Sequence, residues 1–135
     1  MATLKISELS VGDLVRYRGL DYQVKEIDGL FNRVSLVSNK EQRVESIKSI
    51  HPIPITAEML ESNGFVDKGS RLFPYEREWR GGKSTVNICS FDEELWFVDV
   101  EFRDGPTCMS DIPLIYIHQL QHILRLIEVD KEINL

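Results

Sequence analysis

Short segments rich in Val, Tyr, Leu and Ile alternate with turn residues through the first fifty residues of the chain. Turn residues recur every eight to ten positions, and β-branched and aromatic residues are enriched between them, which predicts strands. So few short strands cannot form a β-sandwich, and we expect them to curl into a small β-barrel. The predicted strands span residues 13–18, 21–28, 32–38 and 42–47.

A proline-rich junction ends this strand pattern. Proline fixes its own φ and restrains the residue before it, so Pro52 and Pro54 hold the backbone extended. Thr56 then offers a hydroxyl as the N-cap of a helix. Gly64 suits the left-handed residue that ends a helix, which would place Phe65 to pack back on it. The sequence therefore predicts a helix of about two turns between Thr56 and Gly64.

A second group of strands is predicted after this helix, at residues 71–75, 84–91 and 94–102. Gly-Gly, Asp-Glu and Asp-Gly pairs bound them, which favours an antiparallel meander. In the last strand, alternate residues are apolar on one side and mixed on the other. We expect the apolar side to be core; it comprises Trp96, Val98, Val100 and Phe102.

The final apolar pattern, between residues 116 and 127, is helical. At about 100° per residue, its apolar side chains form one continuous arc. An amphipathic helix can cover the apolar face of a sheet, and this helix is the candidate for that position. His118 and His122 share the polar side of the wheel, which we expect to face solvent or a neighbouring domain. The arc contains Tyr116, Ile117, Leu120, Ile123, Leu124 and Ile127.

The composition is that of a globular chain. Its 135 residues are 42% apolar and 28% charged, which suffices for one sizeable core or two small ones. No run of about 18 apolar residues is present, and the N-terminus lacks the apolar core of a secretory signal. We therefore expect a cytoplasmic protein without a membrane partner. Cys89 and Cys108 have no C-x-x-C spacing, so we expect two buried thiols and neither a disulfide scaffold nor a zinc knot.

The net charge of −6 is concentrated in the second part of the chain. Residues 1–52 contain 8 Lys/Arg and 7 Asp/Glu, a net +1, whereas residues 53–135 contain 8 and 15, a net −7. Nucleic-acid affinity depends mainly on neutralising phosphates with Lys and Arg, so the overall charge disfavours DNA or RNA as a partner.

The first part of the chain is the exception. Basic and aromatic residues are interleaved in it, and such a face suits a nucleic-acid backbone with stacked bases. The other interpretation is that these residues are solvated outer positions of strands, balanced by nearby carboxylates. The alternative nucleic-acid face consists of Arg16, Arg18, Tyr17, Tyr22 and Lys25.

The four-residue spacing of His118 and His122 is the geometry that lets two imidazoles of one helix reach a zinc ion. The metalloprotease pattern H-E-x-x-H needs Glu where this chain has Gln119, which cannot act as a general base. No spacing in the sequence indicates a third ligand. We therefore expect no metal at this pair.

Two other candidate motifs are incomplete. G-G-K-S at 81–84 ends like a phosphate-binding loop, but that loop needs glycine where the chain has Arg77, and the segment leads into a predicted strand. The carboxylates of residues 92–104 lack the spacing and central glycine of a calcium loop, so we expect a solvated hairpin end. No G-x-S-x-G nucleophile elbow is present. The sequence therefore predicts no enzyme and no cofactor.

Residues 76–83, E-R-E-W-R-G-G-K, are predicted to form a charged loop. An aromatic residue among arginines on a loop is typical of an interaction hot spot. The alternative is that the tryptophan folds back as a lid on the sheet. The candidate interaction surface consists of Trp79, Arg77, Arg80 and Lys83.

Two stretches resemble a known group of proteins. I-x-P-I-P-I-T-x-E-x-L-x-x-N-G-F at 50–65 and Y-I-H-Q-L-Q at 116–121 are similar to signature stretches of small uncharacterised proteins of gut Bacteroidales, which are often encoded among prophage or other mobile-element genes. The resemblance implies a phage-related context, but no activity, cofactor or catalytic residue. In that family the position of His122 commonly carries another polar residue, which argues against a shared metal function.

The stretch V-G-D-L-V-R-Y-R-G-L-D-Y-Q-V at 11–24 is similar to the opening of SH3-like barrels of the KOW type. The predicted fold is therefore α+β. An SH3-like β-barrel subdomain at 1–52 is followed by an α+β subdomain at 53–135, whose antiparallel sheet packs against a short helix and a longer C-terminal helix.

Small barrels of this kind bind RNA, DNA, peptides or only their neighbouring domain, so the fold does not choose among these functions. We expect a non-enzymatic accessory or adaptor protein of phage origin, acting through contacts with an unknown protein partner. Nucleic-acid binding through the first subdomain is the alternative.

Overall fold

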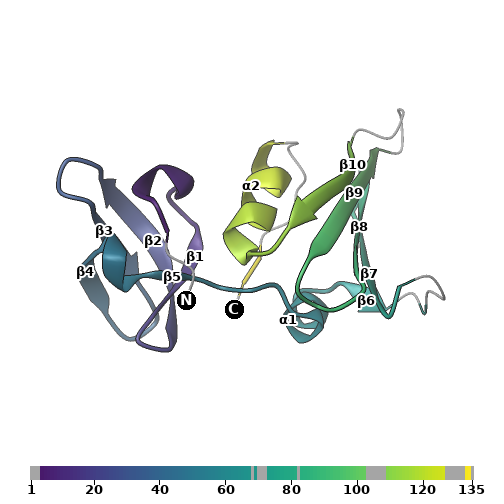
Figure 1. Ribbon diagram of the computed structural model, residues 1–135, viewed down its shortest axis with the longest axis horizontal. Helices are drawn as coiled ribbons and strands as arrows, with labels where there is room; N and C mark the ends of the chain where they lie inside the picture. The colour runs from purple at the N-terminus through teal and green to yellow at the C-terminus, as the bar shows by residue number, and fades with distance from the viewer. Residues whose placement is uncertain are drawn as a thin grey trace. The chain divides into compact units, whose positions relative to one another are not determined.

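The computed structural model describes residues 4–67, 69, 73–81, 83–102, 109–126 and 133–134. The chain divides into two compact units, Met1–Ile53 and Pro54–Leu135. Each unit contains one five-stranded antiparallel sheet, and the helices are few and short, which confirms an α+β fold (Figure 1). The predicted division after residue 52 lies next to the boundary between the units.

The first unit contains strands β1 (Leu14–Tyr17), β2 (Leu20–Asp28), β3 (Arg33–Val37), β4 (Gln42–Ser46) and β5 (His51–Pro52), with 3₁₀-helices at Ile6–Glu8 and Ile47–Ser49. Their order in the sheet is β4-β3-β2-β1-β5, and β1 to β4 are the four strands predicted. β5 pairs with only two residues of β1 and contains Pro52, which has no N–H to donate. Over the described residues β4 and β5 remain separate edges, so the sheet is open where a closed barrel was predicted.

The core of the first unit follows from the alternation of side chains along the strands. On β2, Tyr22 and Val24 are buried, and their sequence neighbours are exposed. A β-bulge between Val24 and Glu26 shifts the register with β3, so that Ile27 rather than Glu26 packs against the core. The core comprises Leu4, Leu9, Val15, Tyr17, Tyr22, Val24, Val34, Leu36, Ile47 and Ile50.

The second unit contains strands β6 (Val66–Asp67), β7 (Tyr75–Arg80), β8 (Ser84–Ser90), β9 (Trp96–Phe102) and β10 (Met109–Leu114). Their order in the sheet is β10-β9-β8-β7-β6. β8 and β9 confirm the strands predicted at 84–91 and 94–102. Of the strand predicted at 71–75, residues 71 and 72 lie outside the described part, and the observed strand begins only at Tyr75.

β7 therefore occupies residues that were predicted as a loop, which corrects the prediction. Residues on its covered side do not form an apolar row, because Arg77 stands between Tyr75 and Trp79. Arg77 is buried, and its charge is neutralised by Glu61. An ion pair thus fills a position where the pattern requires an apolar residue.

Four residues of β9 were predicted to lie on the core side of the sheet, and three of them are fully buried. Trp96, Val98 and Val100 are fully buried, and Phe102 is half-buried. The indole N–H of Trp96 donates to the backbone carbonyl of Ile55 at 3.0 Å. This hydrogen bond anchors the proline-rich junction to the centre of the second core.

Helix α1 (Ala57–Ser62) has the predicted ends. The Thr56 hydroxyl accepts the backbone N–H of Met59 at 3.2 Å. Gly64 has a φ of +86°, and the N–H of Phe65 donates to the carbonyl of Leu60 at 3.0 Å, as in a Schellman motif. Both caps therefore confirm what the sequence predicted.

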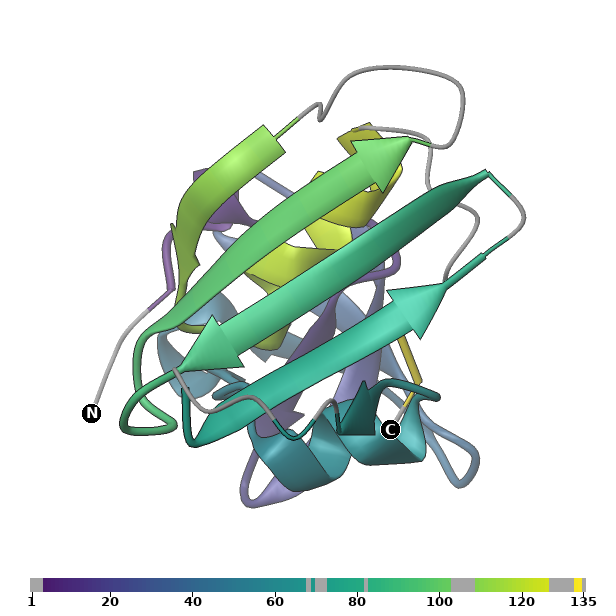
Figure 2. The same ribbon diagram turned by 90° about the vertical axis from the view of Figure 1, so that its right-hand side faces the viewer.

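Helix α2 (Ile117–Leu126) lies on one face of the second sheet, behind the strands in Figure 2. Ile117, Leu120 and Leu124 of the predicted apolar arc are buried, whereas Ile127 lies outside the described residues. No helix among the described residues is long and apolar enough to cross a membrane.

Candidate functional site

The β7–β8 hairpin carries the predicted interaction surface, and Trp79 lies near its turn. The turn is closed by the N–H of Gly81, which donates to the carbonyl of Ser84 at 2.9 Å. Trp79 is half-buried, and its indole covers Gly81 so closely that a Cβ built there would lie 2.3 Å from a ring carbon. Trp79 therefore folds back on its own turn and keeps part of its ring accessible.

Arg77 does not belong to an exposed surface. It is only 7% exposed, and its guanidinium lies 2.9 Å from the Glu61 carboxylate and 3.6 Å from that of Asp67. Glu61 is on α1 and Asp67 on β6, so Arg77 connects three elements of the second unit. Its role in the described structure is internal.

Arg80 and Lys83 are exposed on the hairpin, as a contact surface requires. Arg80 forms an ion pair with Glu78, and the hydrogen bond from Arg80 to this carboxylate raises the pKa of Arg80. The accessible part of the predicted surface is therefore Trp79, Arg80 and Lys83.

The G-G-K-S segment continues directly into a strand, because Ser84 begins β8. The structure thus confirms the expected strand at this position. A phosphate-binding loop needs a helix N-terminus there.

The aromatic residues of the alternative nucleic-acid face are buried in the core of the first unit. Tyr17 and Tyr22 are 6% and 3% exposed, and their rings meet edge to face at a centroid distance of 6.2 Å. Because side chains alternate along β1, Arg16 points to the opposite side from Tyr17 and pairs with Asp21 at 2.9 Å. Arg16 therefore does not share a face with the two tyrosines.

Arg18 and Lys25 of that face are exposed. Arg18 lies in the β1–β2 turn with a φ of +49°, and its guanidinium is 5.4 Å from the centre of the Tyr17 ring. The guanidinium of Arg43 is 5.1 Å from the same ring. Both contacts are cation–π interactions, so Tyr17 already serves as a platform for two arginines of its own unit.

A hydrogen-bonded network borders these rings. The Tyr22 hydroxyl donates to the Glu41 carboxylate, which raises the pKa of Tyr22 and lowers the pKa of Glu41. Arg43 contacts Glu41 at 3.4 Å and Glu45 at 3.0 Å, and its hydrogen bond to Glu45 raises the pKa of Arg43. The network fixes β4 at the rim of the core.

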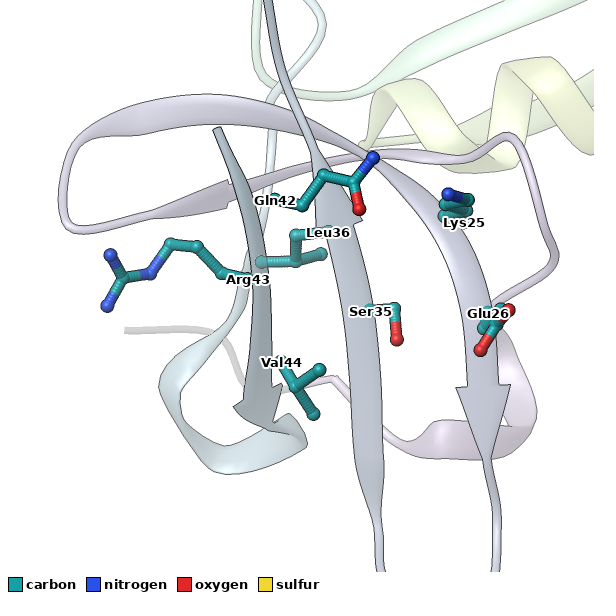
Figure 3. Close-up of a pocket in the computed structure, with 7 residues that line it drawn as sticks. All are labelled: Lys25, Glu26, Ser35, Leu36, Gln42, Arg43 and Val44. Carbon is teal, nitrogen blue, oxygen red and sulfur yellow. The ribbon is translucent and has the colours of Figure 1, made fainter. Parts of the chain in front are cut away.

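The outer face of β2, β3 and β4 contains a hollow of about 330 Å³. Figure 3 shows Gln42, Ser35 and Glu26 over the sheet, whereas the Arg43 side chain points away from it. Val44 is 61% exposed and lies opposite Ser35 in the strand register. The hollow is lined by Lys25, Glu26, Ser35, Leu36, Gln42, Arg43 and Val44.

A second hollow of about 280 Å³ shares Glu26, Ser35 and Val44 with the first. Phe31, which is 60% exposed, contributes an aromatic ring with the Arg33 guanidinium 5.0 Å from the ring centre. Since the two hollows share three residues, they are together termed the outer groove, whose lining includes apolar, polar and charged residues. The second hollow is lined by Glu26, Ile27, Asp28, Phe31, Arg33, Val34, Ser35 and Val44.

The sequence interpretation missed the outer groove. Its signal was present in the alternation of the predicted strands, which places Ser35 and Val44 on the side away from the core. A valine at a solvated position of a strand does not stand out by composition, because isolated exposed apolar residues are normal. The folded arrangement of β3, β4 and the β2–β3 turn brings Val44 and Phe31 to the same hollow.

The histidines of α2 differ in their surroundings from the prediction. His118 is only 2% exposed, although the helical wheel placed it away from the apolar arc. Its ring stacks on Tyr116 at a centroid distance of 5.9 Å and meets His122 edge-on at 5.7 Å. The rings of Tyr116, just before α2, and of His122, one turn further along it, thus help to enclose His118. Over the described ranges, no three His, Cys, Asp or Glu residues form a group suited to a metal ion.

Gln119, which the sequence interpretation considered only as the wrong residue for a metalloprotease, caps α2. Its side-chain oxygen accepts the backbone N–H groups of Ile115 and Tyr116 at 2.9 and 3.0 Å. A Gln that reaches back to the residue before the helix satisfies an N–H that would lack an intrahelical partner.

The acidic hairpin end between β8 and β9 is partly structural. Asp92 and Glu94 are exposed, as predicted, but the Glu93 carboxylate accepts the N–H of Ala57 at 3.0 Å and caps α1. Backbone N–H groups of Glu94 and Leu95 lower the pKa of Asp92. Of the remaining sequence candidates, Cys89 is buried, and Cys108 and Asp104 lie outside the described residues.

Comparisons with protein-family models, curated proteins and solved structures found no match for this chain.

Proposed function

We propose that the protein is a non-enzymatic accessory or adaptor that binds a protein partner through the outer groove. The observation that carries this proposal is the exposed apolar pair of Val44 and Phe31 beside charged residues at one hollow. Exposed apolar side chains rimmed by polar ones mark interaction surfaces. The mixed lining suits an extended peptide whose successive side chains are apolar and charged.

The strand order supports a related proposal about the fold. A meander of four strands, a 3₁₀-helix and a short fifth strand beside β1 is the arrangement expected of an SH3-like barrel, with β5 too short to close it. Peptide binding is one of the functions of such small barrels. A phage-related context and a cytoplasmic location belong to the same proposal and are motivated by the sequence motifs alone.

The test is selection of a random-peptide display library on the immobilised full chain. Enriched peptides are then measured against purified Val44→Gln and Val11→Gln variants. These two valines are matched, because each is 61% exposed and only Val44 lines the groove. We expect binding to Val11→Gln to equal that of the wild type, and binding to Val44→Gln to be weaker by about tenfold.

Thermal unfolding of both variants shows whether either substitution damages the fold. The proposal is wrong if no peptide is enriched over a blank surface, or if selected peptides bind both folded variants equally.

Nucleic-acid binding stays the alternative. Its contacts would come from exposed cations such as Arg18 and Lys25, because Tyr17 and Tyr22 are buried and cannot stack on bases. A gel-shift titration at low salt separates the two functions. Binding that disappears in Arg16→Ala and Arg18→Ala would replace the adaptor proposal.

A further inference from the structure

The second sheet has an outer face, on the side opposite α2, and Figure 2 shows it toward the viewer. Its residues follow from alternation, because Trp96, Val98 and Val100 occupy the buried side of β9. The strand register extends this assignment to β7 and β8. The outer-face residues are Glu76, Glu78 and Arg80 of β7, Thr85, Asn87 and Cys89 of β8, and Phe97, Asp99 and Glu101 of β9.

Carboxylates dominate one part of this face. Cross-strand pairing places Glu78 and Asp99 on either side of Asn87, and Arg80 and Glu101 on either side of Thr85. Among these positions Arg80 is the one cation, and it pairs with Glu78. The outer-face residues of β7, β8 and β9 thus include four carboxylates, one of them Glu76, and one guanidinium.

Exposed apolar side chains gather at the adjoining end of the sheet, around the β8–β9 turn. Phe91 and Leu95 are 63% and 40% exposed. The ring of Phe91 lies 4.6 Å from that of Phe73. Ile115, 43% exposed, directly follows Leu114, whose strand partner is Trp96, so Ile115 lies on the same end as Leu95.

An apolar end beside a row of carboxylates limits which partner can cover this face. A second copy of the same face would set carboxylates against carboxylates, and like charges in contact cost several kcal/mol. A partner with lysines or arginines beside apolar side chains satisfies both parts at once. Isolated exposed apolar residues need no explanation, but a contiguous group indicates a contact site.

We propose that the outer face of β7, β8 and β9, with the apolar end at Phe91 and Leu95, binds a protein segment in which an apolar block adjoins a basic one. This inference rests on the proposed function, since it assigns a second contact surface to a protein that acts through protein contacts. The basic block lies along Glu76, Asp99 and Glu101, and the apolar block covers the turn.

The test uses the full chain and three synthetic peptides in fluorescence-anisotropy titrations near physiological ionic strength. One peptide has a Leu/Phe block followed by a Lys block. The second has Ser in place of the apolar residues, and the third has Glu in place of Lys. We expect the first peptide to bind at least tenfold more tightly than either control, because only it can satisfy both parts of the face.

Variants locate the binding. Leu95→Ser and Glu101→Gln should each weaken binding of the first peptide by about three- to tenfold. Leu20→Ser and Glu8→Gln, at exposed positions of the first unit, are the matched controls and should change binding less than twofold. Equal affinity for the first and second peptides, or no effect of Leu95→Ser, would overturn the inference.

Failure of this inference is distinguishable from failure of the proposed function. If library-selected peptides depend on Val44 and the block peptide does not bind, only the second surface is wrong. If no selected peptide depends on Val44, the outer groove is wrong whatever the block peptide does.

Discussion

At the scale of single residues, the hydroxyl of Tyr22 donates a hydrogen bond to the carboxylate of Glu41, which directly precedes the edge strand β4. The position of β4 therefore depends on this carboxylate being ionised. This bond holds the pKa of Glu41 below its ordinary range in the folded protein. The folded state therefore favours the ionised carboxylate. The resulting stabilisation is complete above the ordinary pKa of glutamate and is lost as the pH falls through the lowered pKa.

Replacing Tyr22 by Phe removes this hydrogen bond. We expect the pKa of Glu41 to rise toward its ordinary value, with Arg43 still lowering it, and the free energy of unfolding to depend less steeply on acid pH. Carboxyl-carbon NMR titration measures the first effect directly. Asp92 is the internal control, because backbone N–H groups of its own turn lower its pKa; a Glu41 titration unchanged by the substitution would contradict the assignment.

The contact of Trp79 with Gly81 gives a second residue-scale prediction. A methyl group at Gly81 would lie 2.3 Å from the indole, so Gly81→Ala should displace the ring toward solvent and shift its fluorescence to longer wavelength. The stability cost should stay below about 1 kcal/mol, because the ring is half-buried and can move. Gly29→Ala is the control, since its Cβ would meet nothing within 4 Å. Identical spectra for both variants would show that Trp79 does not cover the turn.

At the scale of elements, the last described residues are tied to α1 by Asn63. Its side-chain NH₂ donates to the Asn134 carbonyl and its oxygen accepts the Asn134 N–H, both at 2.7 Å. Asn63→Ala removes both bonds from a buried site, together with the 2.9 Å bond from the Asn63 NH₂ to the Met59 carbonyl. It should lower the free energy of unfolding by about 1–3 kcal/mol. Chemical denaturation measures this loss. Exposed Ser62→Ala is the control, because it removes a bond to the same Met59 carbonyl but none to Asn134. A loss no larger than that of Ser62→Ala would mean that the tie contributes little.

The ion pair between Arg77 of β7 and Glu61 of α1 gives a prediction in which removing either partner has a different effect on stability. Glu61→Ala leaves the buried Arg77 with the Asp67 carboxylate at 3.6 Å and the Glu76 carbonyl at 3.0 Å. It should destabilise by about 1–3 kcal/mol, because Glu61 itself is half-exposed. Arg77→Met removes the buried charge altogether and should cost less. Denaturation of both variants in one buffer gives the comparison, and the reverse order would contradict an internal role for Arg77.

The elements that the sequence predicts well are those with local causes. The ends of α1 follow from a hydroxyl at Thr56 and a glycine at Gly64, and the core side of β9 follows from strict alternation. β7 was misplaced because Arg77 is satisfied by Glu61, sixteen positions earlier in the chain, and no local pattern encodes that pair. The partial alternation of β2 has a similar explanation, since a bulge moves Ile27 to the core side after Val24.

The candidate sites also contain residues that local sequence predicts and residues whose placement depends on distant parts of the chain. Arg80 and Lys83 could be predicted as exposed cations because a glycine turn follows β7. The burial of Tyr17 and His118 could not be predicted, because aromatic and imidazole rings occur both in cores and on surfaces. The outer groove depends on the register of β2, β3 and β4, and this register could not be predicted from the sequence pattern.

At the scale of the whole molecule, each of the two units carries an exposed apolar group next to charged residues. In the first unit this group is Val44 and Phe31 at the outer groove. In the second it is Phe91 and Leu95 beside the carboxylates of the outer sheet face. An adaptor needs more than one contact surface, and these two surfaces differ in charge, so we expect them to select different partners.

The most direct test of peptide binding at the outer groove is a chemical-shift map. The ¹⁵N-labelled full chain is titrated with peptides selected on the wild-type protein. We predict that the largest shifts fall on Lys25, Ser35 and Val44, and that they are absent in Val44→Gln but retained in Val11→Gln. Shifts confined to Arg16, Arg18 and other residues away from the groove, or no saturable shifts with any selected peptide, would contradict this prediction.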